Sequence, residues 1–243
     1  MRIGVICEGP SDYHAIESFF GHSLGEAGVR TEFKALQPQM DRTQPEAGWG
    51  NVLLWLKKNP PATRIQSYFG GGLFGGSLAT EPFDCLLIQI DSDILGDAAF
   101  AKFVSDNYGI ILNNPQTPDQ RASAIRCILQ NASQFQDMTS ADVARHLLAP
   151  AVESTEAWCV AAFTVPTINF ESLAGQALVD AFMTVIEKSE GRQPQAGYAK
   201  IDKSPKRREK FCKQHSNGSA RIVAGCAQFG AVHNQLVSLA QSC

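Results

Sequence analysis

Two short acidic motifs, each directly after an apolar run, constrain this chain most. Residues 3–6 lead into Glu8-Gly9-Pro10-Ser11-Asp12, and residues 86–90 lead into Asp91-Ser92-Asp93. Short apolar runs bounded by Gly, Pro and Asp are typical of buried strands. Because ligands of open α/β sheets bind at the carboxyl ends of the strands, we expect both motifs to line one crevice.

Carboxylates that gather in one crevice repel one another, so a cation is expected to hold them together. Oxygen-only ligands of this kind suit Mg²⁺ or Mn²⁺. The five histidines have no paired metal-binding spacing, and the seven cysteines contain no CxxC pair, which argues against a zinc site.

Strand patterns alternate with helix patterns along the rest of the chain. We expect strands at residues 2–7, 29–36, 85–90 and 143–150. We expect helices at residues 11–25, 52–58, 98–105, 118–133, 155–163, 173–189 and 220–239. This alternation predicts an α/β fold with a mostly parallel sheet and helices on both of its faces.

The apolar content, the cysteines and the pattern of the first residues indicate in which cellular compartment the protein is expected. The apolar share of 44% in 243 residues is enough for a sizeable core. An odd number of cysteines, several inside apolar runs, indicates a reducing environment. No apolar run approaches the length of a membrane span, and the first residues are typical of a strand rather than of a signal peptide. We therefore expect a cytoplasmic protein that does not enter the membrane.

Residues 200–221 form a basic segment in a chain whose net charge is −3. The segment contains eight Lys and Arg residues against Asp202 and Glu209, which is a net charge of +6. Such a segment favours a polyanionic partner, although a solvated helix face is an equally open interpretation.

The acidic motifs resemble those of a known family. Glu8-Gly9-x-x-Asp12 followed by Asp91-x-Asp93-x-x-Gly96 resembles the Toprim domain of topoisomerases, primases, recombination mediators and OLD-type nucleases. The chain looks most like small bacterial Toprim-like proteins related to OLD nucleases and abortive-infection factors. Residues 153–158, Glu-Ser-Thr-Glu-Ala-Trp, are similar to the family's third acidic motif, and Tyr198-x-Lys200 is similar to its lysine motif.

The resemblance implies a site and an activity. Asp91 and Asp93 would hold a divalent metal, with Glu8 as a further ligand or general base and Asp12 within reach. Glu153 or Glu156 would complete a second metal site, and Glu156 is favoured because it starts a helix. Lys200 or Lys203 would stabilise charge on a phosphate. Contacts with nucleic acid are expected from Lys203, Lys206, Arg207, Arg208 and Lys210.

The implied protein is a Mg²⁺- or Mn²⁺-dependent nuclease that acts on DNA or RNA, with a role in phage defence. We expect a Toprim-like domain at residues 1–165, with an insertion at about 37–81. A helical C-terminal region at 166–243 is expected to pack on the same core. No ATPase segment accompanies the domain, so an ATPase would be a separate partner.

Two other functions remain open at this point. Recombination mediators keep a Toprim fold for binding without cutting, so a non-catalytic nucleic-acid-binding or assembly module is one alternative. A phosphoryl-transfer enzyme that uses the same metal site on a nucleotide is another. As isolated strings, both acidic motifs also occur in ordinary turns with helix caps.

Overall fold

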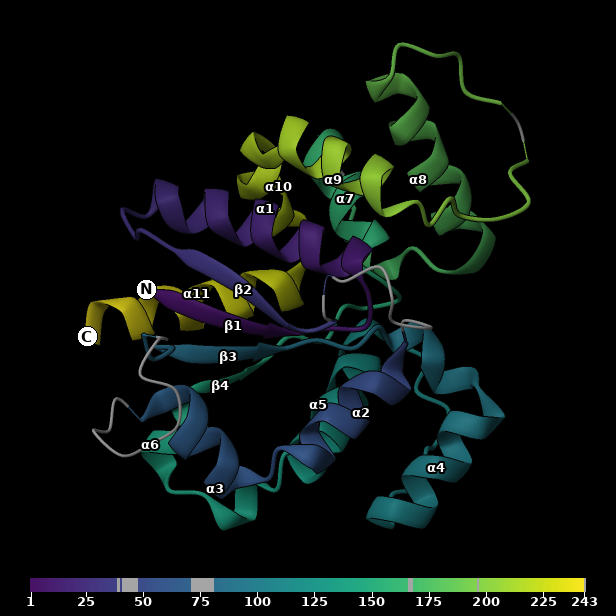
Figure 1. The fold of residues 1–243 in the computed structure, drawn as a ribbon. Helices are drawn as coiled ribbons and strands as arrows, with labels where there is room; N and C mark the ends of the chain where they lie inside the picture. The colour runs from purple at the N-terminus through teal and green to yellow at the C-terminus, as the bar shows by residue number, and fades with distance from the viewer. Residues whose placement is uncertain (39, 41–47, 71–80, 166–167, 196, 243) are drawn as a thin grey trace.

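A four-stranded parallel sheet forms the centre of the protein (Figure 1). The computed structural model describes residues 1–38, 40, 48–70, 81–165, 168–195 and 197–242. In these residues the strands are β1 (Arg2–Ile6), β2 (Glu32–Gln37), β3 (Cys85–Ile88) and β4 (His146–Leu148), in the order β2-β1-β3-β4. All three strand pairs are parallel, so the predicted α/β class with a parallel sheet is confirmed.

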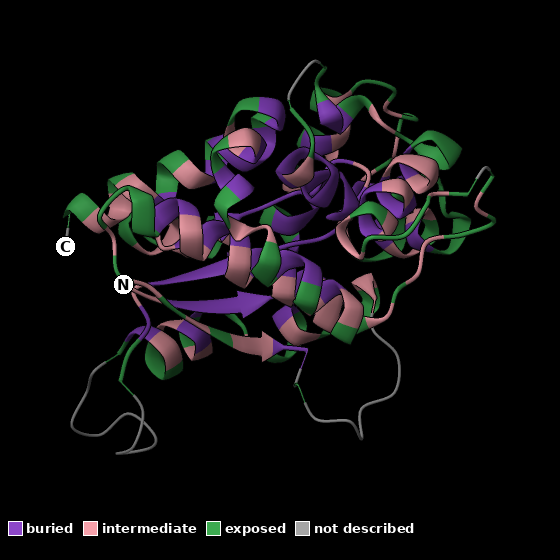
Figure 2. Cartoon of the chain, turned by 90° about the horizontal axis from the view of Figure 1, so that it is seen from above, coloured by how far each residue is buried: buried purple, intermediate pink, exposed green. Residues whose placement is uncertain are grey.

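Helices cover both faces of the sheet (Figure 1). On one face lie α1 (Pro10–Glu26), α7 (Glu156–Phe163), α8 (Gly175–Ser189), α9 (Pro205–Gln214), α10 (Ser219–Gly225) and α11 (Ala227–Ser242). On the other lie α2 (Trp49–Lys58), α3 (Pro61–Arg64), α4 (Ala98–Tyr108), α5 (Pro118–Ala132) and α6 (Ser140–Ala144). Figure 2 shows buried strands at the centre and exposed residues on the outer helix surfaces, and the edge strand β2 is partly exposed.

The apolar runs form strands because both faces of the sheet are covered. Successive side chains of a strand point to opposite faces. Val5 and Leu87 therefore belong to the hydrophobic cluster under α1 and α7, whereas Ile6 and Leu86 belong to the cluster under α2, α4 and α5. All four are fully buried, which explains why these strands have continuous rather than alternating apolar sequences.

The tight connection from β1 to α1 positions the first acidic motif. Gly9 is the extended N-cap residue, Pro10 occupies the first turn, and the backbone N–H of Asp12 donates to Gly9 O at 3.1 Å. Proline suits this position because its missing N–H has no helical partner there. Asp12 thus lies in the first turn of α1, beside the end of β1.

Several expected elements differ from the structure in their bounds, and two differ more than the others. Within residues 143–150, only His146–Leu148 is strand, because α6 continues to Ala144. The helix expected at 220–239 is divided at Cys226 into α10 and α11. Gly230 allows this arrangement, since a Cβ atom there would lie 3.0 Å from the carbonyl oxygen of Val223.

The segment expected to be an insertion contributes to the core where it is described. Val52, Leu53 and Leu56 of α2 are buried in the cluster under α4 and α5. Residues 39, 41–47 and 71–80 of the expected insertion lie outside the described residues. No helix in the described part of the chain is long and apolar enough to cross a membrane.

Candidate functional site

The ends of β1 and β3 bring the two acidic motifs into contact. The backbone N–H of Asp91 donates to Glu8 Oε1 at 2.8 Å, although the residues are 83 positions apart. The carboxylate of Asp91 accepts from Gln89 Nε2 at 2.6 Å. Parallel pairing of β1 with β3 explains the meeting, because both motifs follow the carboxyl ends of adjacent strands.

Asp12 connects the first motif to the third. Its side chain is 9% exposed, and its Oδ1 accepts from Thr155 Oγ1 at 2.7 Å. Thr155 directly precedes α7, so residues 143 positions apart meet at this end of the sheet. The acidic residues of all three motifs therefore surround one region.

The second and third motifs are joined through their backbones. Asp91 forms a parallel bridge with Ala151, and the N–H of Asp93 donates to Glu153 O at 2.9 Å. The N–H of Glu153 donates to Ser92 Oγ at 2.7 Å. These bonds extend the pairing of β3 with β4 beyond the strands and fix the position of Asp93, which is exposed.

Burial and mutual repulsion raise the pKa values of four carboxyl groups. Burial and the charge of Asp12 raise the pKa of Glu8 to about 8. Burial and the charge of Glu156 raise the pKa of Asp12 to about 6. The pKa of Asp91 lies well above its usual range because it is buried near Asp12 and Glu8. The pKa of Asp93 is also raised, because the surrounding protein atoms partly desolvate its carboxylate although the residue reaches the surface. These groups therefore act on one another as a cluster.

Glu156 differs from this cluster because an arginine neutralises it. It is the first residue of α7 and forms a buried ion pair with Arg208 of α9. Burial opposes its ionisation, yet the charge of Arg208 holds the pKa of Glu156 below its usual value. Arg208 also donates to Thr155 Oγ1 at 3.2 Å and lies over the ring of Phe182.

This placement differs from the expected role of Arg208 in contacting nucleic acid. The residue is 2% exposed, so its guanidinium faces α7 rather than solvent. Phe211 and Cys212, one turn further along α9, are buried on the same side of the helix. The Arg208 side chain therefore binds Glu156 and Thr155 inside the protein, and a phosphate at the surface of α9 would not reach it.

Glu153 is also paired with an arginine. Its Oε2 lies 2.6 Å from Arg121 Nη1, and its Oε1 accepts from the N–H of Gly175 at 3.0 Å. Arg121 belongs to α5 and donates through Nη2 to Ser92 O at 2.9 Å. The sequence gives no signal for the role of Arg121, because a single arginine near the start of an expected helix carries no motif.

The basic segment divides into exposed and paired cations. Lys203 lies beside the site: Ser11 Oγ donates to its carbonyl oxygen at 3.4 Å, and its charge lowers the pKa values of Glu8, Asp12 and Asp93. Lys200 is exposed on the same segment. Arg207 is bound by Glu190 and Asp202, each at 2.7 Å.

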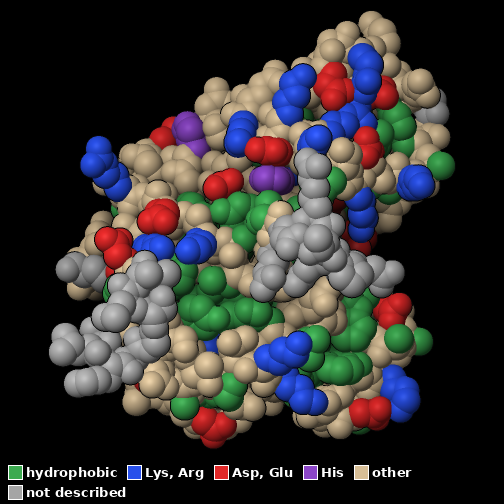
Figure 3. All heavy atoms as spheres, in the orientation of Figure 1, with side chains coloured by type: hydrophobic (Ala, Val, Ile, Leu, Met, Phe, Trp, Pro, Cys, Tyr) green, Lys and Arg blue, Asp and Glu red, His purple; other side chains and the backbone are tan. Residues whose placement is uncertain are grey.

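Lys206 and Lys210 are exposed on α9. Figure 3 shows Lys and Arg side chains interspersed with Asp and Glu over α8 and α9. Of the five cations expected to contact nucleic acid, Lys203, Lys206 and Lys210 are therefore exposed, whereas Arg207 and Arg208 are held by carboxylates.

The donor chemistry of the cluster fits a hard divalent cation, since Glu8, Asp12, Asp91 and Asp93 offer only oxygen. Burial first, and then mutual repulsion, raises their pKa values, and a bound cation would offset both effects by stabilising the ionised carboxylates. In the described residues, however, no three His, Cys, Asp or Glu side chains are arranged to hold a metal ion as they stand.

Comparison with known proteins gives no relative: no family model, curated protein or solved structure matches the chain.

Proposed function

We propose that the protein is a divalent-metal-dependent nuclease with a Toprim-like α/β domain. The observation that supports this most is the meeting of Glu8, Asp12 and Asp91 at the carboxyl ends of two parallel strands. A bound Mg²⁺ or Mn²⁺ would supply charge stabilisation at a phosphodiester and lower the pKa of a bound water.

The residues of the chain would hold and orient the reacting groups. Glu8, Asp91 and Asp93 would supply metal ligands, and the bond from the Asp91 N–H fixes one carboxylate oxygen of Glu8. Lys203, whose charge acts on three of the carboxylates, is better placed than Lys200 to stabilise charge on a phosphate. Exposed Lys206 and Lys210 would bind the backbone of the nucleic acid.

The test is cleavage of plasmid DNA, single-stranded DNA and RNA, each with and without Mn²⁺. We expect metal-dependent cleavage of at least one polymer, lost in Asp91→Asn. Asp106→Asn is the matched control, because Asp106 is an exposed carboxylate on α4 that pairs with Lys102. Cleavage of none of the polymers, or equal cleavage by Asp91→Asn, would refute the proposal.

A non-catalytic nucleic-acid-binding module is the second candidate. It is favoured by the arginine pairing of Glu153 and Glu156, which occupies both carboxylates of the third acidic motif. This candidate predicts nucleic-acid binding that persists in Asp91→Ala and in the presence of EDTA, without cleavage in either. Metal-dependent cleavage by the wild-type protein would exclude it.

A further inference from the structure

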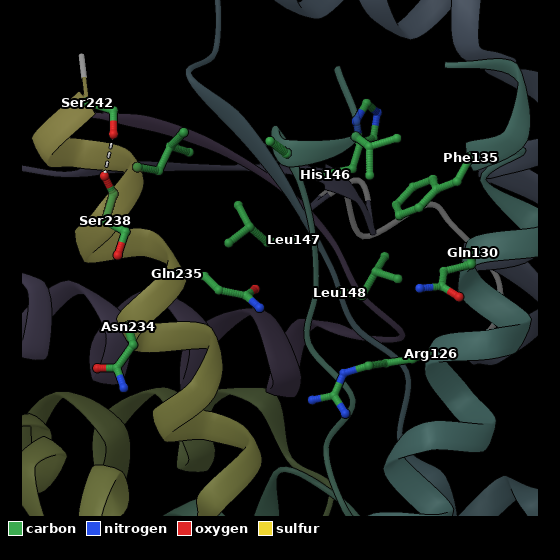
Figure 4. Close-up of a pocket in the computed structure, with 13 residues that line it drawn as sticks. Arg126, Gln130, Phe135, His146, Leu147, Leu148, Asn234, Gln235, Ser238 and Ser242 are labelled. Atoms are coloured by element: carbon green, nitrogen blue, oxygen red, sulfur yellow. Dashed lines mark hydrogen bonds between the residues drawn. The ribbon is translucent and has the colours of Figure 1, made fainter. Parts of the chain in front are cut away.

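A groove separate from the acidic site runs along the edge strand β4. It has a volume of about 610 Å³ and lies between α5 and α11. Figure 4 shows α11 on one side, α5 on the other, and β4 between them. Leu147 and Leu148 lie at the floor, Arg126 and Gln130 come from α5, and Gln235 and Ser238 come from α11. No Asp or Glu is among the described residues that line the groove.

The hydrogen bonds of β4 show which of its backbone groups face the groove. The N–H of Leu86 donates to Arg145 O, and the N–H of Ala149 donates to Ile88 O, both at 2.8 Å. Bonding alternates along a parallel strand, so the peptide groups of Leu147 face β3 and those of the residues on either side face outward.

His146 and Leu148 therefore present their backbone N–H and C=O groups to the groove. β4 is the last strand of the sheet, and within the described residues no hydrogen bond reaches these groups. Both residues are recessed, at 4% and 8% exposed. Backbone groups that are buried and unpaired are costly, so this edge is suited to a ligand that supplies the missing partners.

The shape of the groove favours a single extended peptide segment as its ligand. α5 and α11 form walls on both sides of β4 (Figure 4). A second copy of this chain would have its own β4 equally recessed between two helices, so the two edges could not meet. Pro150 lacks an N–H, which limits pairing to the short stretch before it. A peptide of a few residues without flanking structure fits these constraints.

The charge of the groove favours an acidic segment. Among the described lining residues, Arg126 is the only Lys, Arg, Asp or Glu, and burial lowers the pKa of His146 to about 4, so that histidine is neutral. Arg126 uses Nη2 to bind Gln228 Oε1, and its guanidinium has further N–H donors. A carboxylate that reaches Arg126 would gain a charge-assisted hydrogen bond.

We propose that this groove binds an extended peptide segment of a partner protein. The segment adds to β4 as a further strand, pairs with the backbone of His146 and Leu148, and places a carboxylate at Arg126. This mode of recognition derives affinity from main-chain hydrogen bonds and specificity from the flanking side chains. It does not depend on the function of the acidic site.

The test begins with selection of random linear octapeptides, displayed on phage, against the immobilised protein. Enriched peptides are synthesised and titrated by fluorescence anisotropy against the wild type and three variants. Gln130→Trp fills the groove, and Arg126→Gln removes the cation. Asn131→Trp is the control, because Asn131 is the next residue of α5, exposed and outside the groove lining.

We expect enriched peptides to contain an acidic residue or to use their terminal carboxylate. Gln130→Trp and Arg126→Gln should each weaken binding by about tenfold or more, as loss of a charged hydrogen bond predicts, and Asn131→Trp should leave it unchanged. Hydrogen exchange provides a second measurement: bound peptide should slow exchange of the His146 and Leu148 amides, while the Leu147 amide, already paired, should change little.

Several outcomes would overturn the proposal. They are failure to enrich any peptide, equal binding by Gln130→Trp and the wild type, binding insensitive to Arg126→Gln, or unchanged exchange of the His146 and Leu148 amides. A concentration-dependent dimer that Gln130→Trp abolishes in analytical ultracentrifugation would identify a second copy as the occupant instead. Thermal melts of each variant ensure that only folded proteins are compared.

Discussion

The buried pair between Arg208 and Glu156 allows a quantitative test of how α9 is attached to the acidic end of the sheet. The two side chains are 1% and 7% exposed, so each depends on the other for compensation of its charge. Arg208→Met keeps the apolar bulk near Phe182 but leaves Glu156 buried and unpaired. Removing one partner of a buried pair costs about 3–5 kcal/mol, which corresponds to roughly 6–20 °C in Tm for a chain of this size.

The assay is urea unfolding of Arg208→Met, Glu156→Gln and the double variant, analysed as a double-mutant cycle. The double variant should recover more than half of the loss, because no unpaired charge remains. Arg207→Met is the matched control: this neighbouring arginine pairs with Glu190 at the surface, and its loss should cost about 1 kcal/mol or less.

The pH dependence provides an independent check. Arg208 lowers the folded-state pKa of Glu156, so the contribution of the pair is present above the unfolded pKa and is lost as pH falls through the folded value. The difference between wild type and Arg208→Met should therefore be larger at pH 8 than at pH 4. A loss no greater than that of Arg207→Met, no recovery in the double variant, or a difference independent of pH would refute this reasoning.

Three further predictions concern other parts of the molecule. Without metal, Asp91→Asn should be as stable as the wild type or slightly more stable, because burial and the neighbouring carboxylates disfavour the ionised form of Asp91. Clear destabilisation in a thermal melt would indicate a structural role instead. His146 stays neutral in the fold down to about pH 4, so stability should fall by up to about 3 kcal/mol as pH drops from 6.5 to 4, and His146→Gln should flatten this part of the urea-derived profile. Changing Lys206 and Lys210 to Gln should reduce the slope of log K against log salt for nucleic-acid binding by about 0.7–0.9 for each phosphate that is no longer neutralised, whereas Lys102→Gln should leave the slope unchanged.

The sequence predicted the parts of the site that depend on local pattern. Apolar runs identify buried strands, and the carboxyl ends of parallel strands share one edge of a sheet, so the meeting of Glu8 with Asp91 could be expected from the position of each motif at a strand end. Glu156 was expected at a helix start and is the first residue of α7.

The partners of Glu153 and Glu156 could not be predicted in this way. Arg208 lies in a run of cationic residues whose other members are more exposed. A count of charges along the sequence does not distinguish the buried arginine from its exposed neighbours. Helical spacing gives a usable signal, because Arg208 shares a face with the apolar residues Phe211 and Cys212. Arg121 has no such signal, since its contact with Glu153 depends on how α5 packs against the sheet.

These pairings divide the acidic residues into two sets with different capacities for a metal ion. Glu153 and Glu156 already have a guanidinium each, so a cation there would have to displace Arg121 or Arg208 and leave that arginine unpaired. Within the described residues, Glu8, Asp12, Asp91 and Asp93 form no ion pair of this kind, and burial together with the charges of their neighbours raises their pKa values. If the protein binds a divalent metal as proposed, we expect a single ion held by Glu8, Asp12, Asp91 and Asp93 rather than a two-metal arrangement that includes Glu156. Calorimetric Mn²⁺ titration distinguishes the two: Asp91→Asn should abolish binding, and Glu156→Gln should leave the number of sites unchanged.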